Sequence, residues 1–444
     1  MKAGYFLATL LLLLAGKVEA QTLTVREAIS RALEKNHIVR AAGHDVSAAR
    51  QMSIIANSRY FPVISLEETL AASNAPTQTF MMKLDQSRFS QDDFKINNLN
   101  HPSTWQDFKT TLQLQQPLYV PSLSPLARIA AKETEKSELG LESTRQDTAF
   151  QVFSLYLETR KSEAQLKAAD KAVADALENM RLATIRTAAG IGLRSDELRA
   201  RTHLSMVEQQ LITAGNNLTL AKLRLAITIG WPEDQSFEVS TEPENTLAML
   251  LSDDTTRLAL ETRADLKQFQ TEIEKSEAAV KLANSEYLPS LAAFASYQLN
   301  SRDAPFGIDN DAWIAGATLK WRLFDGFRRG AERSRAIAAR SAAREMFDNK
   351  ANEVRYQLKE SLLRREEAGK RLEVARHALA DAEETVRLIT KRYENSLATM
   401  LELLDAQTVL NQSRANLVEM ETGYALAGGR VYYSSGTFLK EMLK

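Results

Sequence analysis

The segment RYENSLATMLELLDA, residues 392–406, aligns without a gap on RTAAGIGLRSDELRA, residues 186–200. The segment RYFP at residues 59–62 recurs in the same way as EYLP at residues 286–289. Both halves of the chain have the same order of helical, alternating and polar segments, which predicts a duplicated unit. The predicted parts are a first structural repeat at residues 21–230, a connector at 231–253, a second structural repeat at 254–436 and a C-terminal tail at 437–444.

The segments beside the two aligned stretches have the pattern of long helices. Apolar and small residues recur at alternating steps of three and four over residues 372–393 and 403–427. This is the seven-residue period of helices that supercoil on one another. The sequence predicts such helices at residues 125–189, 196–229, 331–395 and 402–433. The two longest would extend roughly 95–100 Å at 1.5 Å per residue. The core stripe of an ordinary helical bundle is the alternative interpretation of this period.

Four segments between the predicted helices alternate apolar and polar residues. The sequence predicts strands at residues 63–72, 108–119, 290–299 and 312–324, with a polar loop at 73–107. In the last strand Trp313 and Leu319 fall on one face, whereas Lys320 and Arg322 fall on the other. These charges do not fit the core of a sandwich, but a strand of a membrane barrel has an apolar outside and a wet lumen. Each segment has roughly the 9–11 residues that a tilted spanning strand needs.

Four strands cannot close into a barrel by themselves. An open sheet edge in lipid would leave backbone N–H and C=O groups without partners. Since transmembrane barrels begin at about eight strands, two or three copies of the chain would be needed to close one. No segment after residue 20 is long and apolar enough for a transmembrane helix. A membrane-embedded part would therefore consist of strands.

The N-terminus, MKAGYFLATLLLLLAGKVEA, has the pattern of a secretory signal peptide at residues 1–20, with cleavage expected after Ala20. Its apolar run is shorter than the roughly 20 residues of a spanning helix, the alternative interpretation. The chain has no Cys, which excludes disulfides and thiolate chemistry. With 56 basic and 57 acidic residues, the net charge of −1 gives no electrostatic reason to expect nucleic acid as a partner.

Taken together, these parts resemble the TolC family of outer-membrane efflux and export channel proteins. The resemblance rests on the signal peptide, the duplicated unit, the YFP and YLP motifs and the two aligned stretches. It implies a mainly α fold with a membrane β-barrel, in which a long heptad helical coiled-coil tunnel continues four strands per chain. Three chains would close a 12-stranded barrel as a homotrimer. The polar loop at residues 73–107 would then lie outside the cell.

The resemblance also implies a function without catalysis. Such a protein is the outer-membrane exit channel of a tripartite efflux system in a Gram-negative bacterium, a passive conduit from periplasm to exterior. Its partners are a periplasmic adaptor protein, an inner-membrane transporter and outer-membrane lipid, and no cofactor or metal is expected. The duct of a type I protein secretion system shares every motif and remains open as an alternative. A periplasmic coiled-coil scaffold is a third interpretation, against which the four alternating segments count.

In this family the two helical reversals form a periplasmic gate, and the resemblance assigns its residues here. Asp196 matches an acid of the first reversal, Tyr393 matches an aromatic residue of the second, and Glu402 and Asp405 match two acids that face inward. Like charges three residues apart share a helix face, so three copies would crowd six carboxylates around one axis. Such a ring would attract cations. The alternative is that both acids are solvated at a helix N-terminus, where the helix dipole favours them.

One gate position departs from the family pattern. Ala398 stands where the family has a basic residue, which removes the expected salt bridge. Arg194 and Arg199 are the candidates to replace it. The resemblance further implies that small and hydroxyl residues in both turns receive the adaptor. These residues are Gly190, Ile191, Gly192, Ser195, Ser396, Leu397, Ala398 and Thr399.

Overall fold

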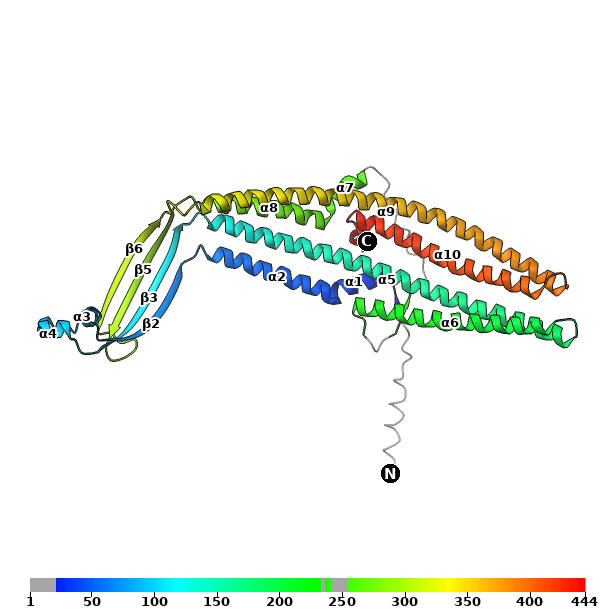
Figure 1. Cartoon of the computed structure of the whole chain (residues 1–444), viewed down its shortest axis with the longest axis horizontal. Helices are drawn as coiled ribbons and strands as arrows, with labels where there is room; N and C mark the ends of the chain where they lie inside the picture. Colours follow the sequence, from blue (N-terminus) through cyan, green and yellow to red (C-terminus); the bar gives the residue numbers. More distant parts are fainter. Residues whose placement is uncertain (1–20, 233–235, 241–253, 444) are drawn as a thin grey trace, which may run out of the picture. The chain divides into compact units, whose positions relative to one another are not determined.

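The computed structural model describes residues 21–232, 236–240 and 254–443 (Figure 1). The predicted signal peptide at residues 1–20 lies outside the described residues, as does most of the predicted connector. The chain divides into two compact units. The first comprises Met1–Asp45, Glu138–Gln268 and Asp348–Lys444, and the second comprises Val46–Ser137 and Phe269–Phe347. Each unit therefore contains segments from both predicted repeats.

The second unit holds a four-stranded antiparallel sheet with strand order β2-β3-β5-β6. Its strands are β2 (Val63–Ser73), β3 (Trp105–Tyr119), β5 (Ser290–Ser301) and β6 (Asn310–Lys320). The last strand was predicted to continue to residue 324, and this was wrong. Lys320 pairs with Ser290, the first residue of β5, and the preceding Pro289 has no N–H to extend the ladder. Trp321 instead donates its indole N–H to the carbonyl of Tyr287 at 3.1 Å.

The register of this sheet separates apolar from polar side chains. Leu66 pairs with Leu112, Leu112 with Tyr297, and Tyr297 with Trp313, so one row crosses all four strands on one face. Trp313 is 77% exposed, and the other three side chains of the row are also exposed. The neighbouring row on the other face includes Thr111. Strands β2 and β6 are the outer strands, so each has an edge that no other strand of the described chain covers.

The predicted polar loop at residues 73–107 contains helical structure that sequence reasoning missed. It forms α3 (Pro76–Asp85), the 3-10 helix η1 (Gln91–Phe94) and α4 (Ile96–Asn100). The rings of Phe80, Phe89 and Phe94 pack edge to face, with centroids 4.4–6.5 Å apart. Gln86 is buried and donates to the carboxylate of Asp107 on β3 at 2.7 Å. These contacts fix the segment to the end of the sheet.

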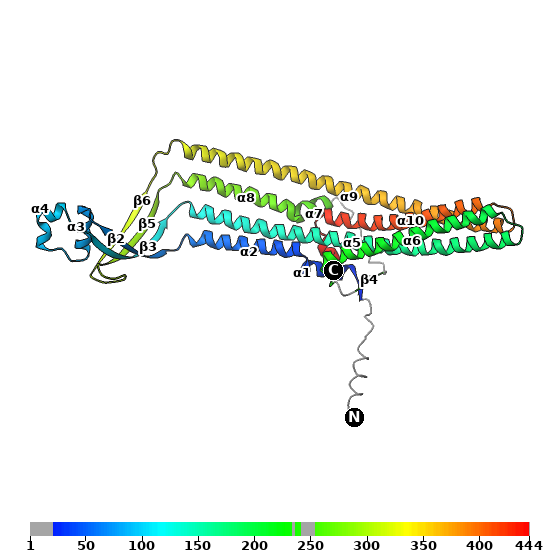
Figure 2. The same cartoon turned by 60° about the horizontal axis from the view of Figure 1, so that its bottom comes forward.

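Helices of 9 to 67 residues make up most of the rest of the described chain. They are α1 (Val25–Lys35), α2 (His37–Ser58), α5 (Leu123–Ala188), α6 (Arg194–Ile229), α7 (Asp254–Thr262), α8 (Ala264–Ser285), α9 (Arg328–Glu394) and α10 (Met400–Ser434). Within the first unit, α6 folds back along α5 and α10 folds back along α9, as both views show (Figures 1 and 2). No helix among the described residues is both long and apolar enough to cross a membrane.

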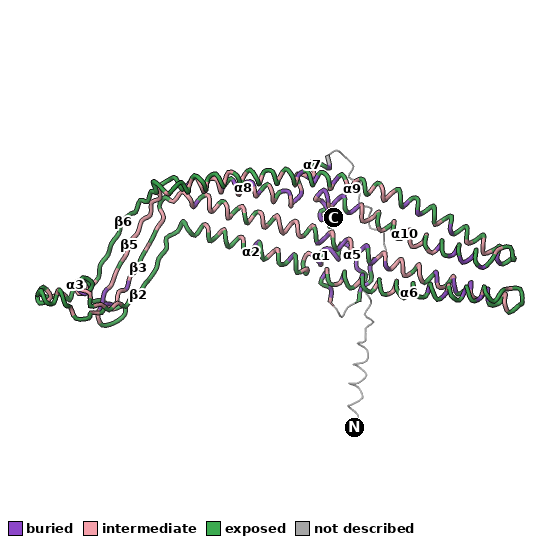
Figure 3. Tube along the Cα trace, in the orientation of Figure 1, coloured by how far each residue is buried: buried purple, intermediate pink, exposed green. Residues whose placement is uncertain are grey.

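The main core of the first unit lies at the ends of these hairpins opposite the reversals. The strand β1 (Gln21–Leu23) pairs in parallel with β4 (Phe237–Val239), which falls in the predicted connector. Around this pair, Ile29, Tyr156, Leu225 and Phe438 are almost completely buried. Buried segments of the trace, in purple, lie near the labels of α1 and the C-terminus (Figure 3). Phe438 begins α11 (Phe438–Met442), so the segment predicted as a C-terminal tail is part of the core. Its apolar residues were too few to show a helical period.

Candidate functional site at the paired helical reversals

Two short reversals join the helices of the hairpins. The first reversal, residues 189–193, lies between α5 and α6, and the second reversal, residues 395–399, lies between α9 and α10. Gly190 has φ of +74°, and Ser396, at the equivalent place in the second copy, has φ of +61°. In the first reversal the amide of Ile191 donates to the carbonyl of Arg186 at 3.0 Å. In the second reversal the amide of Leu397 donates to the carbonyl of Arg392 at 2.7 Å. Each arginine lies in the last turn of the helix that precedes its reversal. The aligned stretches therefore form the same turn twice.

The two reversals meet over a small apolar cluster. Its buried members are Ala183, Ala200, Tyr393, Met400, Leu403 and Leu404. Tyr393 is only 4% exposed, so the structure places this predicted gate residue inside the cluster rather than on the surface. Burial raises the pKa of the Tyr393 hydroxyl; the charge of Arg186 opposes this shift and that of Asp196 adds to it.

The two predicted inward acids lie on the exposed face of α10. Glu402 and Asp405 are exposed, whereas Leu403 and Ala406 beside them are buried. Glu402 also completes a capping box: its carboxylate accepts from the amide of Thr399 at 2.7 Å, and its own amide donates to the Thr399 hydroxyl at 3.2 Å. These hydrogen bonds lower the pKa of Glu402. Glu402 therefore caps the N-terminus of α10. Asp405 takes no part in this capping box.

The arginines proposed from sequence to replace the missing base have other positions. Arg194 forms an ion pair with Glu197, and Arg201 reaches the other oxygen of the same carboxylate at 2.9 Å. Glu197 is 6% exposed and was not among the predicted site residues. Arg199 is exposed and forms no ion pair with any described residue. The structure therefore does not bring Arg194 or Arg199 into an ion pair with the predicted gate acids.

Arg186 is the functional candidate that sequence reasoning missed. Its guanidinium donates to the carbonyls of Tyr393 at 3.1 Å and Glu394 at 3.2 Å, and to the hydroxyl of Ser396 at 2.7 Å. It also lies over the Tyr393 ring, 4.9 Å from the centroid. These four residues are called the Arg186 bridge. The sequence feature that could have identified Arg186 is that both aligned stretches begin with an arginine, Arg186 in the first and Arg392 in the second.

A second polar contact joins the hairpins farther from the reversals. One carboxylate oxygen of Asp175 on α5 accepts from the side-chain amide of Gln407 at 2.9 Å and from the guanidinium of Arg414 at 3.0 Å. Both donors are on α10, and the side chain of Arg414 is only 13% exposed. This contact ties α5 to α10 by a charge-assisted hydrogen bond in addition to apolar packing.

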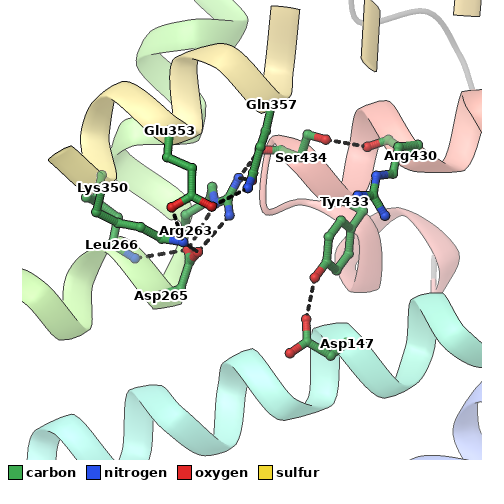
Figure 4. A network of polar contacts seen from close by, with 10 residues as sticks. All are labelled: Asp147, Arg263, Asp265, Leu266, Lys350, Glu353, Gln357, Arg430, Tyr433 and Ser434. Carbon is green, nitrogen blue, oxygen red and sulfur yellow. Dashed lines mark hydrogen bonds and ion pairs between the residues drawn. The ribbon is translucent and has the colours of Figure 1, made fainter. Parts of the chain in front are cut away.

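The C-terminal end of α10 is held by a denser polar network (Figure 4). Arg263, between α7 and α8, donates to both oxygens of Asp265 at 2.9 and 2.6 Å, to the side chain of Gln357 at 2.8 Å and to the carbonyl of Ser434 at 3.3 Å. Lys350 approaches the same Asp265 carboxylate at 3.1 Å. The network connects α8 and α9 to the last turn of α10. Among the described residues, no group of three or more acidic or histidine side chains could hold a metal ion.

Comparison with known proteins identifies the family. The profile of the outer membrane efflux protein family matches residues 28–230 and 255–437. The protease secretion protein PrtF of Dickeya chrysanthemi is 22% identical over 98% of this chain and 93% of its own length. Nodulation protein T of Rhizobium leguminosarum bv. trifolii is 22% identical over 60% of this chain, which spans 58% of that relative.

Solved structures share the fold. The outer membrane protein VceC of Vibrio cholerae superposes with a TM-score of 0.77 at 18% identity, over 93% of this chain and 96% of VceC. The mainly helical fold with four paired strands that the sequence predicts is therefore confirmed, and it is the fold of channel proteins. Since the family profile covers both halves of the chain, the resemblance seen in the sequence is confirmed as well: the chain belongs to the outer membrane efflux protein family.

Proposed function

We propose that this chain is the outer-membrane exit channel of a tripartite efflux system in a Gram-negative bacterium. The observation that carries the proposal is the sheet of the second unit, which has an exposed apolar face and two edges that no strand of the described residues pairs with. A sheet of this kind is stable in lipid only when its edges are paired. Three copies would supply 12 strands, within the range of known transmembrane barrels. The conduit is passive and needs no cofactor.

The partners follow from the same assignment. A periplasmic adaptor protein would dock on the two reversals and connect the channel to an inner-membrane transporter. In support, the reversals present exposed apolar side chains beside small residues: Ile191 is 69% exposed and Leu397 is 67% exposed. Exposed apolar groups rimmed by small and polar residues are typical of protein interaction sites. Gly190, Gly192 and Thr399 complete these two turns.

We test the channel function by location and by conductance. The mature protein should be recovered from the membrane fraction only with detergent, and it should produce ion conductance after reconstitution into planar lipid bilayers. Recovery as a detergent-free periplasmic protein would support the scaffold interpretation instead. A deletion strain separates the two kinds of cargo. Loss of resistance to small toxic compounds supports efflux, whereas loss of a secreted protein supports the type I secretion duct. The full-length similarity to PrtF favours testing that second function.

The gate of this channel would lie at the reversals, with Asp196, Tyr393, Glu402 and Asp405 as its residues. The two exposed acids of α10 would form a cation-attracting ring in a trimer. The test is the double variant Glu402→Gln with Asp405→Asn, because Gln retains the capping box that Glu402 forms with Thr399. We expect its preference for cations over anions in single-channel recordings to fall. Unchanged selectivity would show that both acids are only solvated.

A further inference from the structure

We propose that the Arg186 bridge keeps the periplasmic tip of this channel closed, with Arg186 replacing the basic residue that is absent at Ala398. The proposal rests on the channel function proposed above and adds a residue to its regulation. Arg186 belongs to the last turn of α5, whereas the groups that it contacts belong to the last turn of α9 and to the second reversal. The side chain therefore joins the α5–α6 hairpin to the α9–α10 hairpin at the point where the two would separate.

The acceptors of Arg186 explain why a cation is suited to this place. The carbonyls of Tyr393 and Glu394 belong to the last turn of α9, a helix of 67 residues. Terminal carbonyls of a helix have no intrahelical partner and lie at the negative end of the helix dipole. A planar guanidinium has several donors in a fixed geometry, so it can satisfy two carbonyls and a hydroxyl together. A lysine ammonium at the same place could not match this geometry.

Ser396 gives independent support, because its backbone conformation is unfavourable for serine. Its φ of +61° lies in the left-handed region, where a residue with a Cβ is disfavoured and glycine is not. The first reversal has Gly190 at the equivalent position, with φ of +74°. A strained residue that is kept where glycine would fit suggests a role for its side chain. Here the hydroxyl of Ser396 accepts from Arg186 at 2.7 Å.

The bridge is not a by-product of the duplicated turn. Arg392 occupies the position of Arg186 in the second aligned stretch, but its guanidinium donates to Leu397 of its own reversal at 3.2 Å. The same turn therefore forms around an arginine that stays within one hairpin. Of these two equivalent arginines, Arg186 is the one that crosses to the other hairpin, where its cation also lies over the buried ring of Tyr393.

The first test removes the charge of Arg186 and measures how often the channel is open. Purified full-length mature protein with Arg186→Gln is reconstituted into planar bilayers, and the fraction of time in the high-conductance state is recorded. We expect a rise of roughly tenfold, the factor that corresponds to one charge-assisted hydrogen bond. Arg186→Lys should give an intermediate rise. The control is Arg181→Gln, because among the described residues Arg181 forms an ion pair with Glu178 of its own helix alone and both side chains are more than half exposed. Equal closure of the Arg186→Gln and Arg181→Gln channels would overturn the proposal.

The second test uses Ser396→Gly, which separates the turn from the bridge. Glycine relieves the left-handed conformation, so the second reversal should form at least as well as in the wild type. Because the hydroxyl is lost, we nevertheless expect the channel to open more often. If Ser396 serves only to form the turn, the Ser396→Gly channel should instead be closed as tightly as the wild type and be more resistant to heat. That result would overturn the proposal even if Arg186→Gln failed to assemble.

The two tests also distinguish this proposal from the channel function on which it rests. If the wild type and every variant produce no conductance in bilayers, the channel function is wrong. If the wild type conducts, and Arg186→Gln and Ser396→Gly behave identically to it, the channel function stands and the Arg186 bridge does not control closure.

Discussion

Removal of the Arg263 guanidinium should release the C-terminal end of α10 from its polar network. Arg263→Gln deletes two hydrogen bonds to Asp265, one to the side chain of Gln357 and one to the carbonyl of Ser434. Truncating one partner of a fully buried ion pair costs about 3–5 kcal/mol. Asp265, however, is 26% exposed on its side chain and keeps Lys350 at 3.1 Å. We therefore expect a loss of about 2–3 kcal/mol in the free energy of unfolding, nearer to the cost of a charged hydrogen bond.

The effect should depend on pH in a defined direction. Burial acts to raise the pKa of Asp265, but the hydrogen bonds and charges of Arg263 and Lys350 outweigh it, so the pKa lies below its ordinary value. A lowered carboxyl pKa in the folded state stabilises the protein above the unfolded value of about 3.9, and this stability is lost as the pH falls through the folded pKa. The difference between wild type and Arg263→Gln should therefore be largest near neutral pH and should shrink below about pH 4.

The assay is guanidinium unfolding of the detergent-solubilised protein, followed by the helical circular dichroism signal. The matched control is Arg371→Gln, since Arg371 is 65% exposed on its side chain and pairs with Glu367 of its own helix at 2.8 Å. Loss of an exposed ion pair of this kind should lower the free energy of unfolding by at most about 0.5 kcal/mol. If both variants unfold at the same denaturant concentration, the network of Figure 4 does not hold α10 and the reasoning is wrong.

Three further substitutions test how α10 is held. Gly429→Ala should destabilise the protein by about 1–3 kcal/mol, because the added Cβ would lie 2.4 Å from the ring of Phe153 in the core. Gly423→Ala, whose Cβ would meet no atom within 4 Å, should instead gain up to about 1 kcal/mol of helix propensity in the same unfolding assay. Asp175→Asn should cost about 1.5–3 kcal/mol, because Arg414 loses its carboxylate, and faster amide hydrogen exchange in α10 should report it. Unchanged exchange would exclude a holding role for Asp175.

The helices and their reversals could be predicted from sequence because their causes are local. The seven-residue period identified Leu403, Ala406 and Leu410 as one seam, and all three are buried. The duplication predicted that the two reversals are equivalent, and the shared left-handed residue at Gly190 and Ser396 gives this equivalence a backbone basis. Patterns of this kind depend on neighbours a few residues apart, which a sequence displays directly.

The contacts that distinguish the two copies could not be predicted. Arg186 and Arg392 are equivalent in sequence, but whether each guanidinium stays in its own reversal or crosses to the other depends on how the hairpins pack. The end of β6 at Lys320 likewise depends on where its partner strand begins. Phe438 is buried because distant segments of the chain meet around it. In each case the deciding neighbour is far away in the sequence.

The distribution of these contacts within the first unit indicates where a conformational change would start. At one end of α10 the chain is held by the buried aromatic and aliphatic core around Tyr156 and Phe438 and by the Arg263 network. At the other end the hairpins are joined by a small apolar cluster, the Arg186 bridge and the Asp175 contact. Regions with few buried apolar contacts open at the lowest free-energy cost. Separation of the hairpins should therefore begin at the reversals and stop at the core, with α10 turning about its own C-terminal end. The Arg186 bridge proposed above is then one of the three contacts whose release would start the opening.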